Sequence, residues 1–245
     1  MDKIDILGVL VDHVTMEEAV GRVKGFLEEE KSHVIFTPNS EIIMAAYQDA
    51  SFCHVLNSAD MVIADGIGVV YASRILGAPL PERVAGFDLS SQLIKEAGEG
   101  AYSLYFFGGK PGVAEQAVEK LKVQYPHLRV AGCSDGYFDE EKEKKIIAEI
   151  KDAKPDILFV CLGAPKQEKW IATHREEVGA RVLLGVGGSL DVWAGVTERA
   201  PESYQKAGLE WLYRLQKQPS RFFRMLALPK FGLTVLFKGK RVKKG

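Results

Sequence analysis

Short apolar runs alternate with longer helical patterns along the chain, and this order constrains the fold more than any other feature. Six runs bounded by turn residues have the character of buried strands, at residues 33–36, 61–64, 103–107, 128–132, 157–162 and 182–186. Helical patterns follow most of them, at about residues 41–48, 69–76, 89–97, 113–124, 140–152 and 167–177. Repeated strand-then-helix order predicts an α/β fold with a mostly parallel, Rossmann-like sheet covered by helices on both faces.

The beginning of the chain adds one more apolar run, at residues 4–10, before Thr15 and Glu18 form a capping box that opens a helix to about residue 29. No basic stretch followed by an apolar one occurs there, so we expect no secretory signal and a cytoplasmic location. Three cysteines are scattered without Cys-x-x-Cys spacing, and the five histidines show no paired ligand spacing. A disulfide framework or a structural metal is therefore not expected.

Charge is divided sharply at residue 200. The 32 Lys/Arg and 33 Asp/Glu of the chain split into 21 and 31 over residues 1–199, and 11 and 2 over residues 200–245. The second part interleaves its cations with apolar residues, as in Trp211-Leu212-Tyr213-Arg214-Leu215, which is typical of a segment lying on an anionic membrane. Pro229, Lys230 and Gly232 cut its apolar runs, so it is too short to cross a bilayer. We expect a Rossmann-like domain over residues 1–199 and a basic amphipathic membrane-associating helical appendage over residues 200–245.

Unusual residues follow almost every predicted strand. The loops contain Thr37-Pro38-Asn39, Asp65-Gly66, Gly108-Gly109-Lys110-Pro111-Gly112, Gly163-Ala164-Pro165-Lys166-Gln167 and Gly185-Val186-Gly187-Gly188-Ser189. In open α/β sheets, ligands bind beyond the carboxyl ends of the strands. The five loops therefore predict one crevice.

Two of these loops suit a nucleotide diphosphate. Gly108 and Gly109 leave backbone N–H groups open to a phosphate, although a plain tight turn explains them equally well. Gly187 and Gly188 permit close approach of a ligand, and Asp191 has a carboxylate that can accept from ribose hydroxyls. An acid at the start of a helix is the structural alternative for Asp191.

Asp65 is the sharpest candidate for chemistry, because it ends the apolar run at residues 61–64 and is followed by a glycine. Partial desolvation raises the pKa of a carboxylate in such a place, as a general base requires. The structural alternative is an Asp-Gly turn on the surface.

Four further polar residues each have a functional and a structural interpretation. Thr37 and Asn39 flank a proline before a helix, so one can cap the helix or both can orient a sugar or phosphate. Arg83 has the planar guanidinium that suits a diphosphate, and a surface ion pair is its alternative. Gln167 begins a helix, where its amide can hold sugar hydroxyls or simply face solvent.

Five stretches together resemble the WecG/TagA/CpsF family of glycosyltransferases, in the family's order and over essentially the whole chain. They are Phe36-Thr37-Pro38-Asn39-Ser40, Ala64-Asp65-Gly66-Ile67-Gly68-Val69-Val70, Glu82-Arg83-Val84-Ala85-Gly86, Leu162-Gly163-Ala164-Pro165-Lys166-Gln167-Glu168 and Gly185-Val186-Gly187-Gly188. The resemblance implies that Asp65 is the catalytic base, that Thr37, Asn39, Arg83 and Gln167 belong to the active site, and that the C-terminal residues target a membrane.

The same resemblance implies a reaction. N-acetylmannosamine would pass from its UDP donor to undecaprenyl-diphosphate-linked N-acetylglucosamine, forming a β-1,4 linkage in wall teichoic acid linkage-unit synthesis at the inner face of the bacterial plasma membrane. Another UDP-sugar, such as N-acetylmannosaminuronic acid or glucose, is the alternative within the family. An α-linked donor and a β-linked product require inversion, with Asp65 deprotonating the acceptor. No Asp-x-Asp metal motif occurs, so we expect no metal or other cofactor.

The basic C-terminal residues have a predicted part in catalysis as well. We expect them to cover the crevice and to bring Arg214, Arg221 or Arg224 to the substrate diphosphates, where arginines offset the charge of the leaving group. Away from the membrane, we expect the same residues either to be mobile or to bury their apolar side chains in a homo-oligomer. Nucleic acid is not an expected partner.

Two other protein classes remain open from the residues alone. A nucleotide-dependent oxidoreductase would use residues 108–112 with Asp135 as the ribose contact, but the G-x-G-x-x-G spacing is missing. A non-enzymatic membrane adaptor explains the basic C-terminus but not five polar loops.

Overall fold

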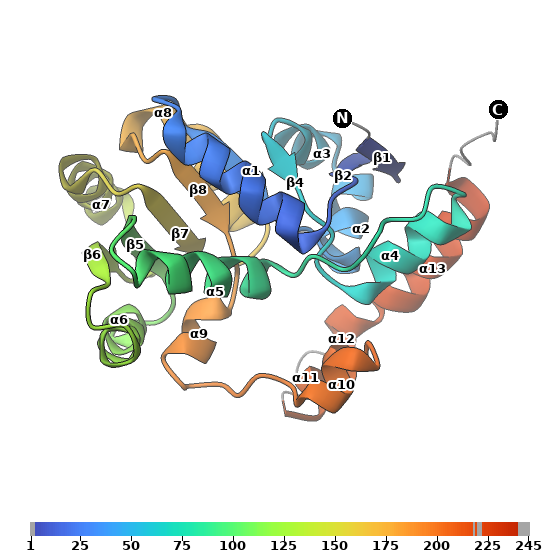
Figure 1. Cartoon of the computed structure of the whole chain (residues 1–245). Helices are drawn as coiled ribbons and strands as arrows, with labels where there is room; N and C mark the ends of the chain where they lie inside the picture. Colours follow the sequence, from blue (N-terminus) through green and yellow to red (C-terminus); the bar gives the residue numbers. More distant parts are fainter. Residues whose placement is uncertain (1–2, 218, 220–221, 240–245) are drawn as a thin grey trace.

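A parallel sheet of six strands forms the centre of the protein, in the order β4-β3-β8-β7-β5-β6 (Figure 1). The computed structural model describes residues 3–217, 219 and 222–239. The strands are β3 (His33–Phe36), β4 (Met61–Val62), β5 (Ser103–Gly108), β6 (Arg129–Ser134), β7 (Ile157–Cys161) and β8 (Val182–Gly185). Every neighbouring pair is parallel, and the predicted fold class is confirmed.

Helices cover both faces of this sheet. One face carries α2 (Ser40–Gln48), α3 (Ala50–Asn57), α4 (Ile67–Ile75), α7 (Glu140–Ala153), α8 (Lys166–Val178) and α13 (Ala227–Lys238). The opposite face carries α1 (Met16–Glu28), α5 (Gly86–Ala97), α6 (Val113–Gln124) and α9 (Ser189–Trp193). Central strands such as β3, β7 and β8 are buried at every residue, because apolar side chains on both of their sides meet helices.

The first apolar run forms a separate hairpin instead of a sheet strand. β1 (Lys3–Ile6) and β2 (Val9–Asp12) pair antiparallel, and the chain turns at Leu7 and Gly8, which both have positive φ. Asp12 at the end of β2 is buried, pairs with Arg22 and accepts a hydrogen bond from the backbone N–H of Val62. The hairpin is thereby attached beside β4.

Two other local predictions differ from the structure. The run 61–64 is a strand only over β4, although the N–H of Ile63 still donates to the carbonyl of Phe36 in β3 at 2.9 Å. Helix α3 was not predicted. It begins directly after α2 because Asp49 ends one helix and caps the next, accepting from the N–H groups of Ser51 and Phe52.

The direction of the connections explains where ligands can enter. The chain leaves β5 toward α6 on one face and leaves the neighbouring β7 toward α8 on the other face. The connections after the neighbouring strands β3 and β8 also go to opposite faces, from β3 to α2 and from β8 to α9. Diverging connections leave space between the carboxyl ends of adjacent strands, which is where open α/β sheets bind ligands.

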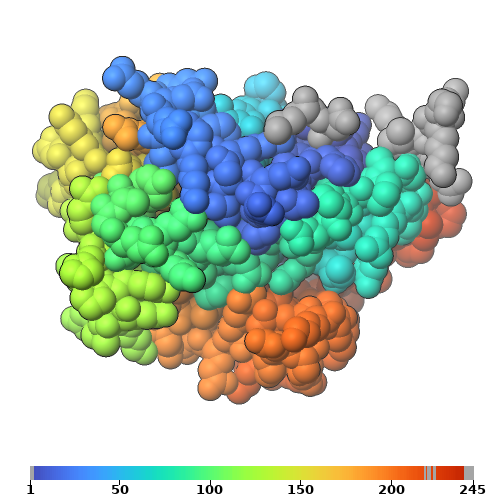
Figure 2. Space-filling model, in the orientation of Figure 1, coloured from blue at the N-terminus to red at the C-terminus, as the bar shows by residue number. Residues whose placement is uncertain are grey.

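Residues 200–239 are called the C-terminal segment from here on, and the residues of this segment that the structure describes include four helices. They are α10 (Glu202–Lys206), α11 (Glu210–Lys217), α12 (Phe222–Met225) and α13. Figure 2 shows the first part of this segment, in orange, along the lower edge of the body. Helix α13 packs against α2 and α4, with Phe231 and Val235 buried in the same core as those helices. No helix among the described residues is long and apolar enough to cross a membrane.

Candidate active site

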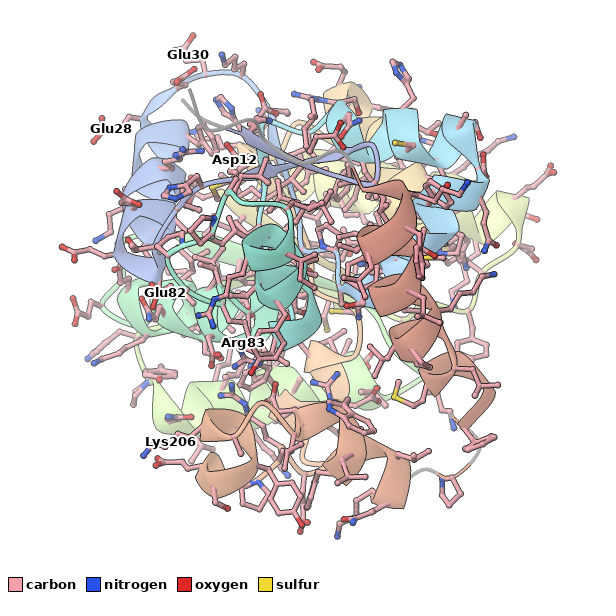
Figure 3. All side chains as sticks on the ribbon, turned by 90° about the vertical axis from the view of Figure 1, so that its right-hand side faces the viewer. Asp12, Glu28, Glu30, Glu82, Arg83 and Lys206 are labelled. Carbon is pink, nitrogen blue, oxygen red and sulfur yellow. The ribbon has the colours of Figure 1, made fainter. Side chains whose placement is uncertain are left out.

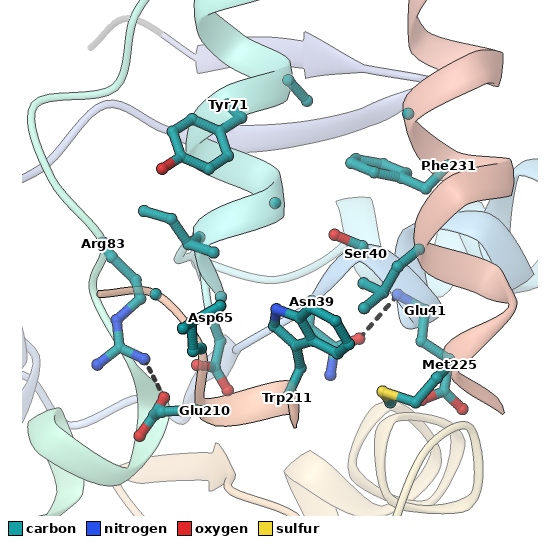
Figure 4. Close-up of a pocket in the computed structure, with 18 of the residues that line it drawn as sticks. Asn39, Ser40, Glu41, Asp65, Tyr71, Arg83, Glu210, Trp211, Met225 and Phe231 are labelled. Atoms are coloured by element: carbon teal, nitrogen blue, oxygen red, sulfur yellow. Dashed lines mark hydrogen bonds and ion pairs between the residues drawn. The ribbon is translucent and has the colours of Figure 1, made fainter. Parts of the chain in front are cut away.

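A cavity of about 620 Å³ opens between the loops that follow β3 and β4 and the helices of the C-terminal segment. Its polar end contains Asn39, Asp65, Arg83, Glu210 and Arg214. In Figure 4, Asp65 lies between Arg83 and Trp211 at this end, and Tyr71 and Phe231 stand at the other. The cavity therefore brings together loops of the sheet with a segment more than 120 residues further along the chain.

Asp65 follows β4 and lies half-buried in this cavity. Burial raises the pKa of Asp65 to about 6, although the nearby positive charges of Arg214 and Arg83 favour the ionised form. The negative charge of Glu210 adds to the increase of this pKa. A carboxylate with this pKa is mostly ionised at neutral pH and still basic enough to take a proton from a hydroxyl group. Gly66 does make a turn, with φ of 110° at the start of α4, but the Asp65 side chain faces the cavity rather than open solvent.

Arg83 projects from the loop between α4 and α5 toward the C-terminal helices, as Figure 3 shows. It forms an ion pair with Glu210, the first residue of α11, and a second with Asp88 at 3.4 Å. Arg199 completes the cluster, 2.6 Å from Asp88 and 3.7 Å from Glu210. The ion-pair interpretation of Arg83 is therefore correct in part, but the pair lies inside a cavity and beside Asp65.

Asn39 and Thr37 differ in position although they are two residues apart. Asn39 caps α2, accepting from the N–H groups of Glu41 and Ile42 at 2.9 and 3.1 Å, and also lines the cavity. Thr37 is buried and donates from its hydroxyl to the carbonyl of Gly185 at 2.9 Å. Thr37 thus ties the ends of β3 and β8 together, and its contact with substrate stays a prediction.

Gln167 is buried in the first turn of α8, so the solvent-facing interpretation is wrong. Its Oε1 accepts from the N–H of Gly187 at 3.0 Å, and its Nε2 donates to the carboxylate of Glu168 at 2.8 Å. Burial raises the pKa of Glu168. Gln167 lies against Gly185 as well, where an added Cβ would meet its side chain at 3.1 Å. In this structure the residue positions the loop after β8.

A second cavity, of about 290 Å³, lies over the carboxyl ends of β5, β7 and β8. Four of the five residues predicted to bind the nucleotide line it, namely Gly109, Gly187, Gly188 and Asp191. Lys110 also lines this cavity and provides a positive charge there. Asp191 also lies in the first turn of α9, as its structural interpretation requires, and its contact with a ribose stays a prediction.

Gly108 lies next to this cavity without lining it. An added Cβ there would collide with the backbone of Cys161, whose carbonyl carbon would be only 2.5 Å away, and φ is 133°. Gly108 therefore allows β5 and β7 to approach closely where they end, and its nucleotide contact stays a prediction.

The residues of the oxidoreductase alternative have other partners. Asp135 forms an ion pair with Lys142 at 2.8 Å and accepts from the N–H of Tyr137 at 2.9 Å. These interactions hold the pKa of Asp135 below its usual range, against the effect of burial. The carboxylate is thus engaged by its own loop and by the first turn of α7.

Three arginines of the C-terminus were predicted to reach the substrate diphosphates, and the structure describes the side chain of one of them. Arg214 in α11 lines the large cavity. Arg221 lies outside the described residues, and the side chain of Arg224 in α12 is likewise outside the described part of the structure. No group of three or more potential metal ligands occurs among the described residues.

Sequence reasoning missed Glu210, Arg199 and Asp88. Glu210 had a usable signal, because it is one of only two acids in residues 200–245 and stands directly before Trp211. A lone acid in a strongly basic segment needs a cationic partner or an open surface. Nothing local identifies Arg83 as that partner.

A titratable carboxylate beside arginines, together with glycine loops around a second cavity at the same edge of the sheet, is the arrangement of an α/β enzyme that acts on an anionic ligand. Comparison with known proteins specifies the family. The family model of the WecG/TagA/CpsF glycosyl transferases matches residues 4–245, and the chain belongs to this family.

Curated relatives extend over most of the chain. A Bacillus subtilis (strain 168) protein is 39% identical over 221 residues, covering 90% of this chain and 85% of the relative. A Staphylococcus aureus (strain MW2) protein is 36% identical over 244 residues, covering 99% and 95%. A Bacillus spizizenii protein is 39% identical over 211 residues, covering 86% and 81%. All three carry the name N-acetylglucosaminyldiphosphoundecaprenol N-acetyl-beta-D-mannosaminyltransferase.

Proposed function

We propose that this glycosyltransferase moves N-acetylmannosamine from its UDP donor to N-acetylglucosamine linked to undecaprenyl diphosphate, with inversion at the anomeric carbon. The observation that carries the proposal is Asp65, a carboxylate with a pKa of about 6 in a cavity that also contains Arg83 and Arg214. The names of relatives that match nearly the whole chain support the choice of substrates.

The two cavities suit the two substrates. The glycine loops around Gly109 and Gly187, with Lys110 and Asp191, suit the diphosphate and the ribose of a UDP-sugar. The larger cavity has the base and the arginines that a hydroxyl-bearing sugar on a lipid diphosphate requires. Placing the donor over β5, β7 and β8 puts its sugar toward the acceptor at the ends of β3 and β4.

The chemistry follows from the groups in the larger cavity. Asp65 takes the proton of the acceptor hydroxyl while that oxygen forms a bond to the anomeric carbon of the donor. The bond from this carbon to the diphosphate breaks on the opposite face, and UDP leaves with the electron pair. Arg83 and Arg214 are the fixed positive charges near this reaction, and such charges stabilise a developing anion in a site shielded from water. The proposal requires no metal ion.

The C-terminal segment supports a position at the inner face of the plasma membrane. Large apolar side chains on α13 are exposed, including Leu233, Leu236 and Phe237 at 56%, 50% and 80%. Lys230 and Lys238 lie on the same helix. Apolar groups enter the interface of a bilayer while cations meet lipid phosphates. The same side chains would be covered by a homo-oligomer in the absence of a membrane.

The direct test is turnover with defined substrates. UDP-N-acetylmannosamine and undecaprenyl-diphosphate N-acetylglucosamine in vesicles should release UDP and give a β-linked disaccharide, as read by NMR. UDP-N-acetylglucosamine, UDP-glucose and UDP-N-acetylmannosaminuronic acid serve as matched donors. If the enzyme prefers one of these donors, it transfers a different sugar from the one that we propose. Release of UDP without a glycosylated acceptor would contradict transfer.

Membrane association has a separate test. The triple variant Leu233→Ser, Leu236→Ser, Phe237→Ser should lose flotation with phosphatidylglycerol vesicles, because it removes exposed apolar side chains and no charge. Val123→Ser is a suitable control, because it also replaces an exposed apolar side chain with serine. Val123 is 84% exposed and belongs to α6, outside the C-terminal segment. Equal flotation of the triple variant and wild type would contradict this part of the proposal.

A further inference from the structure

The large cavity changes character along its length. Its polar end holds Asp65 and the arginines, and most of the other lining side chains are apolar and come from two helices, although Ser40 and Glu41 of α2 also line it (Figure 4). Helix α4 contributes Tyr71, Ala72 and Ile75, and helix α13 contributes Leu228, Phe231 and Val235. We propose that this apolar part, called the α4–α13 groove, binds the isoprenoid chain next to the diphosphate of the acceptor. The inference rests on the proposed function and adds the site of the lipid.

The groove is held open by well-packed neighbours. Phe231 and Val235 are 3% and 1% exposed, so α13 is fixed against the body on one side of the space. Gly232, the next residue after Phe231, lines the cavity, and a Cβ added there would meet nothing within 4 Å. A glycine inside a helix costs stability relative to alanine. Its position at an unfilled space indicates room for a ligand rather than a defect of packing.

The kinds of group that line the cavity match the kinds of group in the acceptor. A lipid-linked sugar has its hydroxyl, then its diphosphate, then an apolar chain. The cavity has Asp65, Arg83 and Arg214 among its lining residues, and many of the others are apolar. A UDP-sugar has no apolar chain, so burial of hydrocarbon favours the acceptor over the donor as the occupant.

The outer end of the groove leads to the surface that we assign to the membrane. Tyr71 and Ile75 line the cavity and are still 51% and 38% exposed, so the space reaches solvent beside them. Leu236 and Phe237, on the same helix α13, are exposed as well. A long isoprenoid chain can therefore lie in the groove with its first units and continue into the bilayer with the others.

The test compares two water-soluble acceptors without vesicles. N-acetylglucosamine diphosphate is esterified either to an ethyl group or to a geranylgeranyl group, both used below the concentration at which they aggregate. Wild type should have a KM for the geranylgeranyl acceptor that is lower by on the order of tenfold or more, because the buried hydrocarbon contributes to binding. Equal KM values would overturn the groove while leaving the transferase function in place. Absence of turnover with either acceptor would overturn the proposed function and the groove with it.

Two variants locate the effect. Gly232→Leu fills the groove from α13, and Ile75→Gln makes the opposite wall polar at a position that is already partly exposed. In both, the tenfold ratio of the two KM values should fall to less than about threefold. Gly25→Leu is the matched control, because Gly25 lies on the exposed surface of α1 and its added side chain also meets nothing within 4 Å. A wild-type ratio in both folded groove variants, checked by circular dichroism, would overturn the inference.

Discussion

Arg83, in the loop before α5, is ion-paired with Glu210 at the start of α11, a residue 127 positions further along the chain. Asp88 also pairs with Arg83, and Arg199 pairs with both Asp88 and Glu210, so opposite charges alternate around a closed cluster. The cluster attaches the C-terminal segment beside Asp65. Under the proposed function, a substrate diphosphate would bring a negative charge to Arg83, as Glu210 does in this structure.

Asp65→Asn should remove most turnover and leave binding of UDP nearly intact. Asparagine keeps the shape of the side chain but cannot take the proton, and loss of a general base typically costs about 10²- to 10⁴-fold. Steady-state kinetics and calorimetric titration with UDP would measure the two effects. Near-normal turnover would remove Asp65 from the role of base.

Glu210→Gln should move the acid limb of the pH–rate profile to lower pH. Turnover of wild type should fall as pH falls through about 6, since the pKa of Asp65 is about 6 and protonated Asp65 cannot act as a base. The negative charge of Glu210 helps to raise this pKa, so its removal lets Arg214 and Arg83 lower it. Glu202→Gln is the control, because Glu202 is exposed and its ion pair is with Lys206 on the same short helix. An acid limb that stays in place, or moves to higher pH, would contradict the electrostatic link.

Asp65→Asn should also stabilise the folded protein above pH 6. Asp65 ionises near 3.8 when unfolded and near 6 when folded, so its burial costs stability as pH rises through this window and the full cost is present above it. At 1.36 kcal/mol per pH unit, the variant should gain about 1 to 3 kcal/mol at pH 8 and nothing from this source below pH 3.8. Denaturant unfolding at the two pH values measures the gain. A gain of equal size at both would point to a cause other than ionisation.

Gly108→Ala should destabilise the protein by about 2 kcal/mol or more, because the new methyl group meets the backbone of Cys161 in a conformation that alanine rarely adopts. Gly179→Ala separates the two causes. Gly179 has φ of 64° at the end of α8, but an added Cβ there meets nothing within 4 Å. Thermal unfolding should show a clearly smaller loss for Gly179→Ala, and equal losses would mean that close approach of β5 and β7 is not the reason for Gly108.

Turnover should persist in the presence of EDTA. Arg83 and Arg214 lie near the base, and guanidinium groups can carry the charge of a leaving diphosphate without a divalent ion. The measurement is UDP release after dialysis against chelator, with Mg²⁺ and Mn²⁺ added back. Loss of activity that either ion restores would contradict metal independence.

Local patterns in the chain were enough to predict the sheet. Each of the six predicted sheet strands appears, with small shifts at the ends, because a strand buried on both faces requires an apolar run whatever its neighbours are. Strand order was not predictable, since β3 pairs with β8 across almost 150 residues through contacts that no local pattern records. Helix α3 was missed because one aspartate ends a helix and caps the next.

Some features of the candidate site were predictable from the sequence, and others depend on the tertiary structure. An aspartate after an apolar strand and glycines after three others were visible in the sequence, and the parallel sheet necessarily placed them at one edge. The partners of Arg83 and Gln167, and the space beside Gly232, were decided only by packing. A side chain's partners depend on which distant segments are packed beside it, and that is a property of the whole fold rather than of any stretch of sequence.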